Sequence, residues 1–113
     1  MTDRELIELA AKAAGIFLVW DCPPTDWPPM VYDGDIYHQW IPLTDDGDAL
    51  RLAVKLDLIV HCDSVWQEVE AMLVTRSYED DYVRMSEKYG NDPYAATRRA
   101  IVRAAAEIGR AMP

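Results

Sequence analysis

The sequence predicts a single α/β domain, a three-layer α-β-α sandwich with a small, mostly antiparallel sheet and a long C-terminal helix. Residues 16–20 and 58–62 are short apolar runs without alternation, which is typical of strands covered on both faces. The apolar residues of segment 44–56 cover more than half of a helix circumference, so we expect that helix to be buried on more than one side. Residues 92–112 repeat apolar positions at helical spacing, after an Asp-Pro pair that suits a helix start.

Length and composition are those of one domain. The chain has 113 residues, half of them hydrophobic, and it contains no internal repeat and no linker. We therefore interpret residues 1–113 as one domain whose core needs no metal or disulfide. Four side chains from different predicted elements are expected to be buried in that core: Leu18, Leu52, Val60 and Ile101.

The cysteine content favours a reduced compartment. The two cysteines, Cys22 and Cys62, are fewer than a disulfide-stapled secreted domain of this size carries. We expect both to be unbridged, to pack as small hydrophobic residues, and to lie in a cytoplasmic protein. No apolar stretch approaches the roughly 20 residues that cross a bilayer, so no membrane partner is expected. Residues 2–5 do not resemble a signal peptide.

Capping residues mark both ends of the first predicted helix, residues 2–14. Thr2 and Glu5 form a capping-box pattern at its start. Gly15 follows at the position where a left-handed cap is favoured.

An acidic run, residues 45–48, begins the second predicted helix. Either Thr44 or Asp45 is expected to cap it, and acidic side chains are favourable near a helix N-terminus. The run also suggests a calcium loop, but such a loop needs a bidentate Glu at its twelfth position, counting the first ligand as position one. Leu56 stands at that position, so we interpret the acidic residues as helix caps.

The remaining segments are more ambiguous. Residues 31–40 fit one strand with a bulge or two short strands, in which Asp33 and Gly34 form a hairpin turn. Residues 66–75 fit either strand or helix, and we choose strand because isolated strands need neighbours. Residues 77–89 show helical spacing of Tyr and Met and are expected to be a short helix, with an irregular arm as the alternative.

Two long strings resemble a known family. Residues 40–56 read WIPLTDDGDALRLAVKL, and residues 92–109 read DPYAATRRAIVRAAAEIG. Together they are similar to the phage α-β-α sandwich domain family, small proteins of tailed phages and prophages. The resemblance implies a three-layer fold and a phage or prophage origin, and it implies no activity.

Catalytic and metal-binding motifs are not found. In the sequence His61-Cys62-Asp63, a strand would place His61 and Asp63 on one face and Cys62 on the other. No Cys-x-x-Cys or His-x-x-x-His pattern completes a zinc site, and His38 is the other histidine. No nucleophile elbow or phosphate loop is present. We expect a packed histidine and a core cysteine, no cofactor, and no enzymatic activity.

Arginines on the last helix are the feature most suggestive of a binding site. Arg99, Arg103 and Arg110 share one narrow face, and Arg98 lies beside it, nearer the core. Arginine binds carboxylates and phosphates through two parallel hydrogen bonds. The alternatives are a solvated face in which Glu107 pairs with Arg103, an anion site, or a contact with the acidic body of a second copy. We expect reversal of Arg99 and Arg103 to Glu to leave folding intact.

Trp27 is a second candidate for binding. It lies in the Pro-rich segment 21–29, between Asp26 and Pro28, and is the tryptophan most expected to be exposed. Exposed tryptophan often anchors a protein interface.

The resulting functional hypothesis is a non-enzymatic cytoplasmic protein that engages a host protein, in host takeover or in inhibition of a defence system. The net charge of −9 disfavours direct nucleic-acid binding and is compatible with acidic mimicry of nucleic acid. The alternative is a binder of a small anionic ligand such as a nucleotide, through Arg98 and Arg99 with tyrosines of 77–89. A homo-oligomer, and an enzyme with His61 in a cleft beside an acid, are further alternatives.

Overall fold

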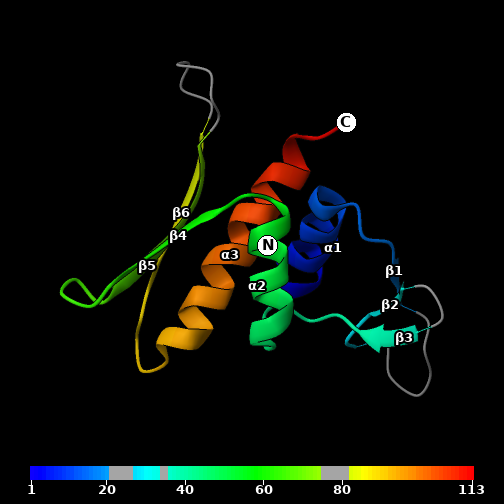
Figure 1. The fold of residues 1–113 in the computed structure, drawn as a ribbon, viewed down its shortest axis with the longest axis horizontal. Coiled ribbons are helices and arrows are strands. Elements are labelled where there is room, and N and C mark those ends of the chain that lie inside the picture. The colour runs from blue at the N-terminus through cyan, green and yellow to red at the C-terminus, as the bar shows by residue number, and fades with distance from the viewer. Residues whose placement is uncertain (21–26, 34–35, 75–81) are drawn as a thin grey trace.

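Three helices form the centre of the fold (Figure 1). The computed structural model describes residues 1–20, 27–33, 36–74 and 82–113. The helices are α1 (Asp3–Ala14), α2 (Asp46–Lys55) and α3 (Pro93–Ala111). The predicted mixed α/β class and the long C-terminal helix are confirmed. None of the helices in the described ranges is long and apolar enough to cross a membrane.

The strands of the described residues form two antiparallel sheets, one on either side of the helices, where the sequence predicts one sheet. The first sheet has the order β1-β2-β3, and the second has the order β4-β5-β6. The strands of the first are β1 (Leu18–Val19), β2 (Met30–Asp33) and β3 (Ile36–Gln39). Those of the second are β4 (Ile59–Asp63), β5 (Glu68–Val74) and β6 (Tyr82–Lys88).

Of the two alternatives for residues 31–40, the structure has the two short strands, because β2 and β3 pair antiparallel with Asp33 opposite Ile36. Asp33, predicted as a turn residue, instead ends β2. The other predicted turn residue, Gly34, lies outside the described residues. The choice of strand for residues 66–75 is also confirmed by β5.

The predicted helix at residues 77–89 is wrong in its described part, which forms β6. Its start at Ser77 lies outside the described residues. The helical spacing of the aromatic residues misled the prediction, because the segment also alternates with period two. Val83, Met85 and Glu87 are partly covered, whereas the intervening side chains are exposed.

The helix ends form as the sequence predicts. Thr2 Oγ1 accepts a hydrogen bond from the Glu5 N–H at 3.1 Å, and Gly15 adopts φ 70° at the other end of α1. Asp45, rather than Thr44, caps α2 by accepting from the Asp48 N–H at 2.8 Å. Asp92 caps α3, accepting from two backbone N–H groups.

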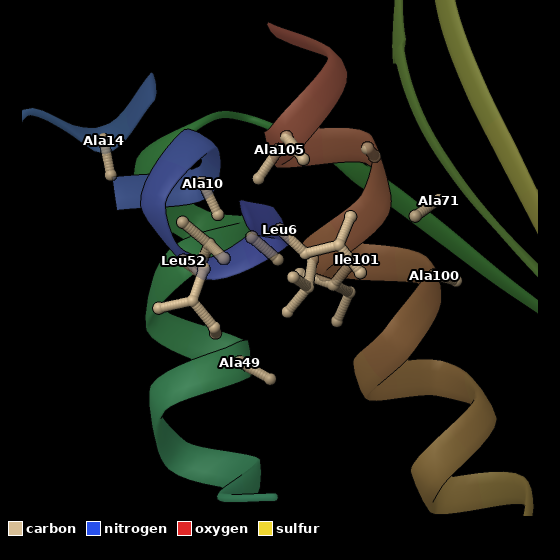
Figure 2. Packing of buried hydrophobic residues seen from close by; sticks show 14 of the residues in the cluster. Leu6, Ala10, Ala14, Ala49, Leu52, Ala71, Ala100, Ile101 and Ala105 are labelled. Carbon is tan, nitrogen blue, oxygen red and sulfur yellow. The ribbon is translucent and has the colours of Figure 1, made fainter. Parts of the chain in front are cut away.

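The core lies where α1 and α2 pack against α3 (Figure 2). Leu6, Leu52 and Ile101 fill its centre, and alanines occupy most of the remaining buried positions. Small side chains let the helices approach closely. At Gly109 of α3, an added Cβ would lie 2.0 Å from the backbone oxygen of Leu9 in α1.

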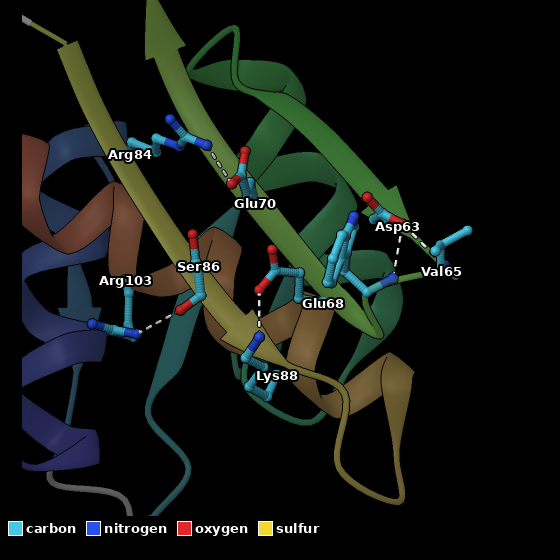
Figure 3. Close-up of polar contacts among 9 residues, drawn as sticks. Asp63, Val65, Glu68, Glu70, Arg84, Ser86, Lys88 and Arg103 are labelled. Carbon is cyan, nitrogen blue, oxygen red and sulfur yellow. Dashed lines mark hydrogen bonds and ion pairs between the residues drawn. The ribbon is translucent and has the colours of Figure 1, made fainter.

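The β4-β5-β6 sheet covers α3 with one face. Val69 and Ala71 are fully buried there. The other face carries cross-strand ion pairs, Glu70 with Arg84 and Glu68 with Lys88 at 2.8 Å (Figure 3). One face of this sheet is therefore apolar and the other is polar, as is usual for antiparallel sheets.

The expectation of strands covered on both faces is wrong. Leu52 and Ile101 are buried as predicted, but Leu18 is only partly buried and Val60 is 36% exposed. The reason is that the two sheets stay separate, so that β4 is the edge of one sheet and β1 the edge of the other.

The second helix is also less buried than predicted. Its apolar residues divide between two faces, because Ala49, Leu52 and Ala53 point into the core while Leu50 and Val54 are exposed. No further layer in the described part of the chain covers the outer face of α2.

Candidate binding groove

An apolar groove of about 500 Å³ lies between α2, α3 and β4. We call it the α2–β4 groove. Leu50 stands on one wall, and Val60 with Cys62 stands on the other. Tyr94 and Ile101 of α3 also line it. Two consecutive elements, α2 and β4, and the distant helix α3 therefore build one concave surface.

Large apolar side chains are exposed on and around this groove. Exposed fractions are 64% for Leu50, 68% for Val54 and 70% for Tyr94. Leu50 and Val54 are four residues apart on one helix, so they form a continuous outward ridge. Large apolar surfaces that gather in one place on a folded protein mark sites of contact with another molecule.

One charge in the groove is already neutralised. The guanidinium group of Arg98 donates to Asp46 Oδ1 at 2.6 Å and to the backbone oxygen of Leu43 at 2.9 Å. The Arg98 side chain is 16% exposed. Arg98 thus links α3 to the start of α2. Because Asp46 neutralises its charge, Arg98 offers little positive charge to a ligand.

Cys62 is exposed and unbridged, which corrects the expectation that it packs in the core. It lines the groove beside Tyr89. Partial burial and the nearby Cys62 thiol raise the pKa of Tyr89 above its ordinary value. Cys22, the other cysteine, lies outside the described residues.

The arginine stripe occupies a different place. Arg99 and Arg103 line a second pocket, of about 400 Å³, between the start of α1, α3 and β6. Glu87 of β6 lies between them: Arg103 Nη1 is 2.6 Å, and Arg99 Nε 3.6 Å, from Glu87 Oε1. Arg99 is also 3.4 Å from Asp3. The carboxylate of Glu87 therefore occupies the place beside Arg99 and Arg103 where an anionic ligand was expected.

Two details of the stripe correct the sequence-based expectation. Glu107 pairs with Arg110 at 3.6 Å, whereas Arg103 pairs with Glu87 and also donates to the Ser86 backbone oxygen at 3.3 Å. Arg99 and Arg103 therefore help to attach β6 to α3, and reversing their charge is no longer expected to leave folding intact.

The two arginines of the nucleotide hypothesis do not converge on one site, although Arg98 shares its pocket with Tyr89 and Tyr94. Arg98 lines the α2–β4 groove, and Arg99 lines the second pocket. Of the tyrosines proposed to complete the site, Tyr78 lies outside the described residues and Tyr89 lines the groove, away from Arg99.

Trp27 is 41% exposed, as expected. Its ring stacks on Trp20 with ring centroids 6.0 Å apart, and the Arg4 guanidinium lies 4.3 Å from the Trp20 ring. Its predicted role in binding stays a prediction. The neighbouring Asp26 lies outside the described residues.

The catalytic candidates do not assemble into a site among the described residues. Asp63 accepts hydrogen bonds from the N–H groups of Val65 and Trp66, at 2.9 and 3.1 Å, and so shapes the turn after β4 (Figure 3). His61 is exposed on the strand. No group of three or more metal-binding side chains occurs in the part of the chain that the structure describes.

Apart from Arg98 and Tyr89, the residues of the groove were not recognised as functional from the sequence. The sequence does carry one signal for the groove. The α2 segment has more apolar residues than one buried face requires, Leu50 and Val54 among them. That surplus was interpreted as burial within the chain. Tyr94 has the helical spacing of the apolar residues of α3, such as Ile101, yet it is exposed.

No family model matches the chain, and no curated protein or solved structure is significantly similar to it. The resemblance to the phage α-β-α sandwich domain family stays a prediction.

Proposed function

We propose that this protein is a non-enzymatic binding protein of a phage or prophage, which engages a host protein in the host cytoplasm through the α2–β4 groove. The observation that carries the proposal is the pair Leu50 and Tyr94, each about two-thirds exposed on one apolar groove, with the equally exposed Val54 one helical turn from Leu50. The phage setting and the cytoplasmic location rest on the sequence.

Protein association fits this groove in energetic terms. Transfer of a large apolar side chain out of water is favourable by about 1.5–3 kcal/mol. Covering the three exposed side chains would therefore supply several kcal/mol toward association, before its entropic cost is met. An exposed tyrosine adds a rigid anchor of the kind that concentrates binding energy in interfaces.

Acidic mimicry of nucleic acid receives less support than groove binding. A mimic needs an array of free carboxylates, but most of the described acidic side chains pair with a basic residue of the same chain, as Asp46 does with Arg98 and Glu87 with Arg103. Binding of a small anion receives less support for the same reason, since Glu87 already neutralises Arg99 and Arg103.

Site-specific photo-crosslinking in cells of the native host tests the proposal. A benzophenone amino acid replaces Leu50 in one variant and Phe17 in a matched control, because Phe17 is also a large, exposed apolar residue but lies away from the α2–β4 groove. A discrete protein adduct is expected from position 50 and not from position 17. Absence of an adduct at position 50, or the same adducts from both positions, would overturn the proposal.

A further inference from the structure

We propose that the partner binds by adding an extended strand to the free edge of β4, with apolar side chains facing the α2–β4 groove and basic side chains facing the other way. This inference rests on the proposed function, and it specifies the geometry and the chemistry of the bound segment.

The outer edge of β4 is open for pairing. β4 is an edge strand that pairs with β5 alone among the described strands. In an antiparallel pair, half of the backbone N–H and C=O groups of an edge strand point away from its neighbour. No further backbone hydrogen bond involving residues 59–63 occurs in the described part of the chain. Those groups are thus left to water or to an added strand.

β4 also lacks two of the residue types that protect edge strands. It contains no proline and no lysine, and Ile59 and Val60 are exposed. The opposite edge, β6, is different, because Arg84 and Lys88 lie on it and Arg103 donates to its Ser86 backbone oxygen. Of the two edges of this sheet, β4 is the one suited to strand addition.

The register of β4 determines the side-chain pattern of the added strand. Val60 and Cys62 line the groove, so Ile59, His61 and Asp63 face the other side of the sheet. Side chains of an added strand alternate in the same way. Those beside Val60 and Cys62 enter the apolar groove, and the intervening ones lie on the polar face, next to His61 and Asp63.

The charges around the groove favour a basic strand. Asp57, Asp63 and Asp92 each lie within three residues of a groove-lining residue, and none is in an ion pair within the described part of the chain. The arginine that lines the groove, Arg98, is neutralised by Asp46. A second copy of the chain would bring another −9 of net charge to this acidic surface, which disfavours pairing of β4 with itself.

The turn between β4 and β5 extends the apolar surface beyond the strand. Val65 and Trp66 are exposed there, with Trp66 at 71%. The hairpin projects from the body of the protein (Figure 1). A strand longer than the five residues of β4 would reach this tryptophan, which is a favourable interface anchor.

A synthetic peptide of alternating lysine and valine, seven residues long, is the probe. Binding to the full chain is followed by NMR titration of the β4 amide resonances. Two further peptides carry N-methyl groups, one on the backbone nitrogens of the lysines and the other on those of the valines. Strand addition uses the N–H groups of one edge, so one methylated peptide is expected to lose at least about tenfold in affinity while the other binds nearly unchanged.

Two protein variants make the matched comparison. Val60→Glu places a carboxylate on the groove face of β4, and Ile59→Glu places one on the opposite face of the same strand. Only Val60→Glu is expected to abolish binding of the lysine–valine peptide. A peptide with glutamate in place of lysine is expected to bind at least about tenfold more weakly than the lysine peptide.

The possible failures are distinguishable. Equal binding of both methylated peptides would overturn strand addition but leave groove binding intact. Equal binding of the glutamate and lysine peptides would overturn the basic character of the partner. A dimer of the unliganded protein in sedimentation, abolished by Val60→Glu and not by Ile59→Glu, would show that the occupant is a second copy. Failure of the crosslink at position 50 would overturn the proposed function instead.

Discussion

Arg103 of α3 and Glu87 of β6 are joined by an ion pair of 2.6 Å, which connects the long helix to the last strand of the sheet that covers it. The same carboxylate lies 3.6 Å from Arg99, one helical turn away. The sequence suggests that the arginines of α3 bind another molecule. In the structure, Arg99 and Arg103 instead make a contact within the fold.

Reversing the charge of Arg103 tests this structural role. Arg103→Glu is expected to lower the free energy of unfolding by about 1–2 kcal/mol, because it replaces a partly buried, hydrogen-bonded pair with two like charges. Arg110→Glu is the control, because Arg110 is 65% exposed and its ion pair with Glu107 is longer, at 3.6 Å. The effect of this change on the free energy of unfolding should stay within about 0.5 kcal/mol. Urea unfolding measures both, and equal effects would contradict the assignment.

Leu52 and Leu50 provide a matched pair on one helix. Leu52→Ala should lower the free energy of unfolding by about 2–5 kcal/mol, because Leu52 is 2% exposed and its truncation leaves a cavity. Leu50→Ala removes the same atoms from a side chain that is 64% exposed, and should cost less than about 1 kcal/mol. Thermal and urea denaturation give both values. A large loss at Leu50 would mean that its outer face is covered.

Gly109 is expected to tolerate no side chain. Alanine has the higher helix propensity, by about 1 kcal/mol, so a site without steric conflict would gain stability. Here the added Cβ would lie 2.0 Å from the Leu9 backbone oxygen, and relieving that overlap means moving α1 away from α3. We expect Gly109→Ala to lose about 2–3 kcal/mol in urea unfolding.

The control for that loss is Gly90→Ala, which has open space around its Cβ but a positive φ of 58°. It should lose only about 1 kcal/mol. A gain in stability for Gly109→Ala would show that the two helices are not in close contact at this point.

Cys62 should react readily in the folded protein. With Cys22 replaced by serine, the remaining thiol is exposed, and its reaction with a disulfide reagent is expected to proceed within about tenfold of the rate of a cysteine peptide. Reaction only after addition of denaturant would contradict the exposed position of Cys62. Titration of the unmodified chain, denatured without reductant, should find two thiols, because both cysteines are expected to be unbridged.

Much of the local structure was predictable because its causes lie within a few residues. Asp92, Pro93 and the apolar spacing that follows are sufficient to begin a helix, and Gly15 is sufficient to end one. The β2–β3 pair is of the same kind, since its two strands are close together in the chain.

The candidate site was not predictable in the same way. The sequence drew attention to α3, but it selected the arginines, which the fold pairs with Asp3, Asp46, Glu87 and Glu107. Those carboxylates come from other elements or from a neighbouring turn, and no periodicity shows which of them comes close. The sequence shows that Leu50 and Val54 are apolar, but it does not show whether another element covers them. In the structure both side chains are exposed.

The sequence by itself determined the helix boundaries, the α/β class and the long C-terminal helix, because capping, spacing and turn chemistry act over short distances. Only the tertiary structure decided that residues 82–88 are a strand, that the strands divide into two sheets, and that β4 is left as an exposed edge beside a groove. Apolar runs show that a segment prefers to leave water. Which neighbour covers it depends on contacts between residues far apart in the chain, and at β4 the described part of this chain leaves one strand edge and part of the apolar face uncovered.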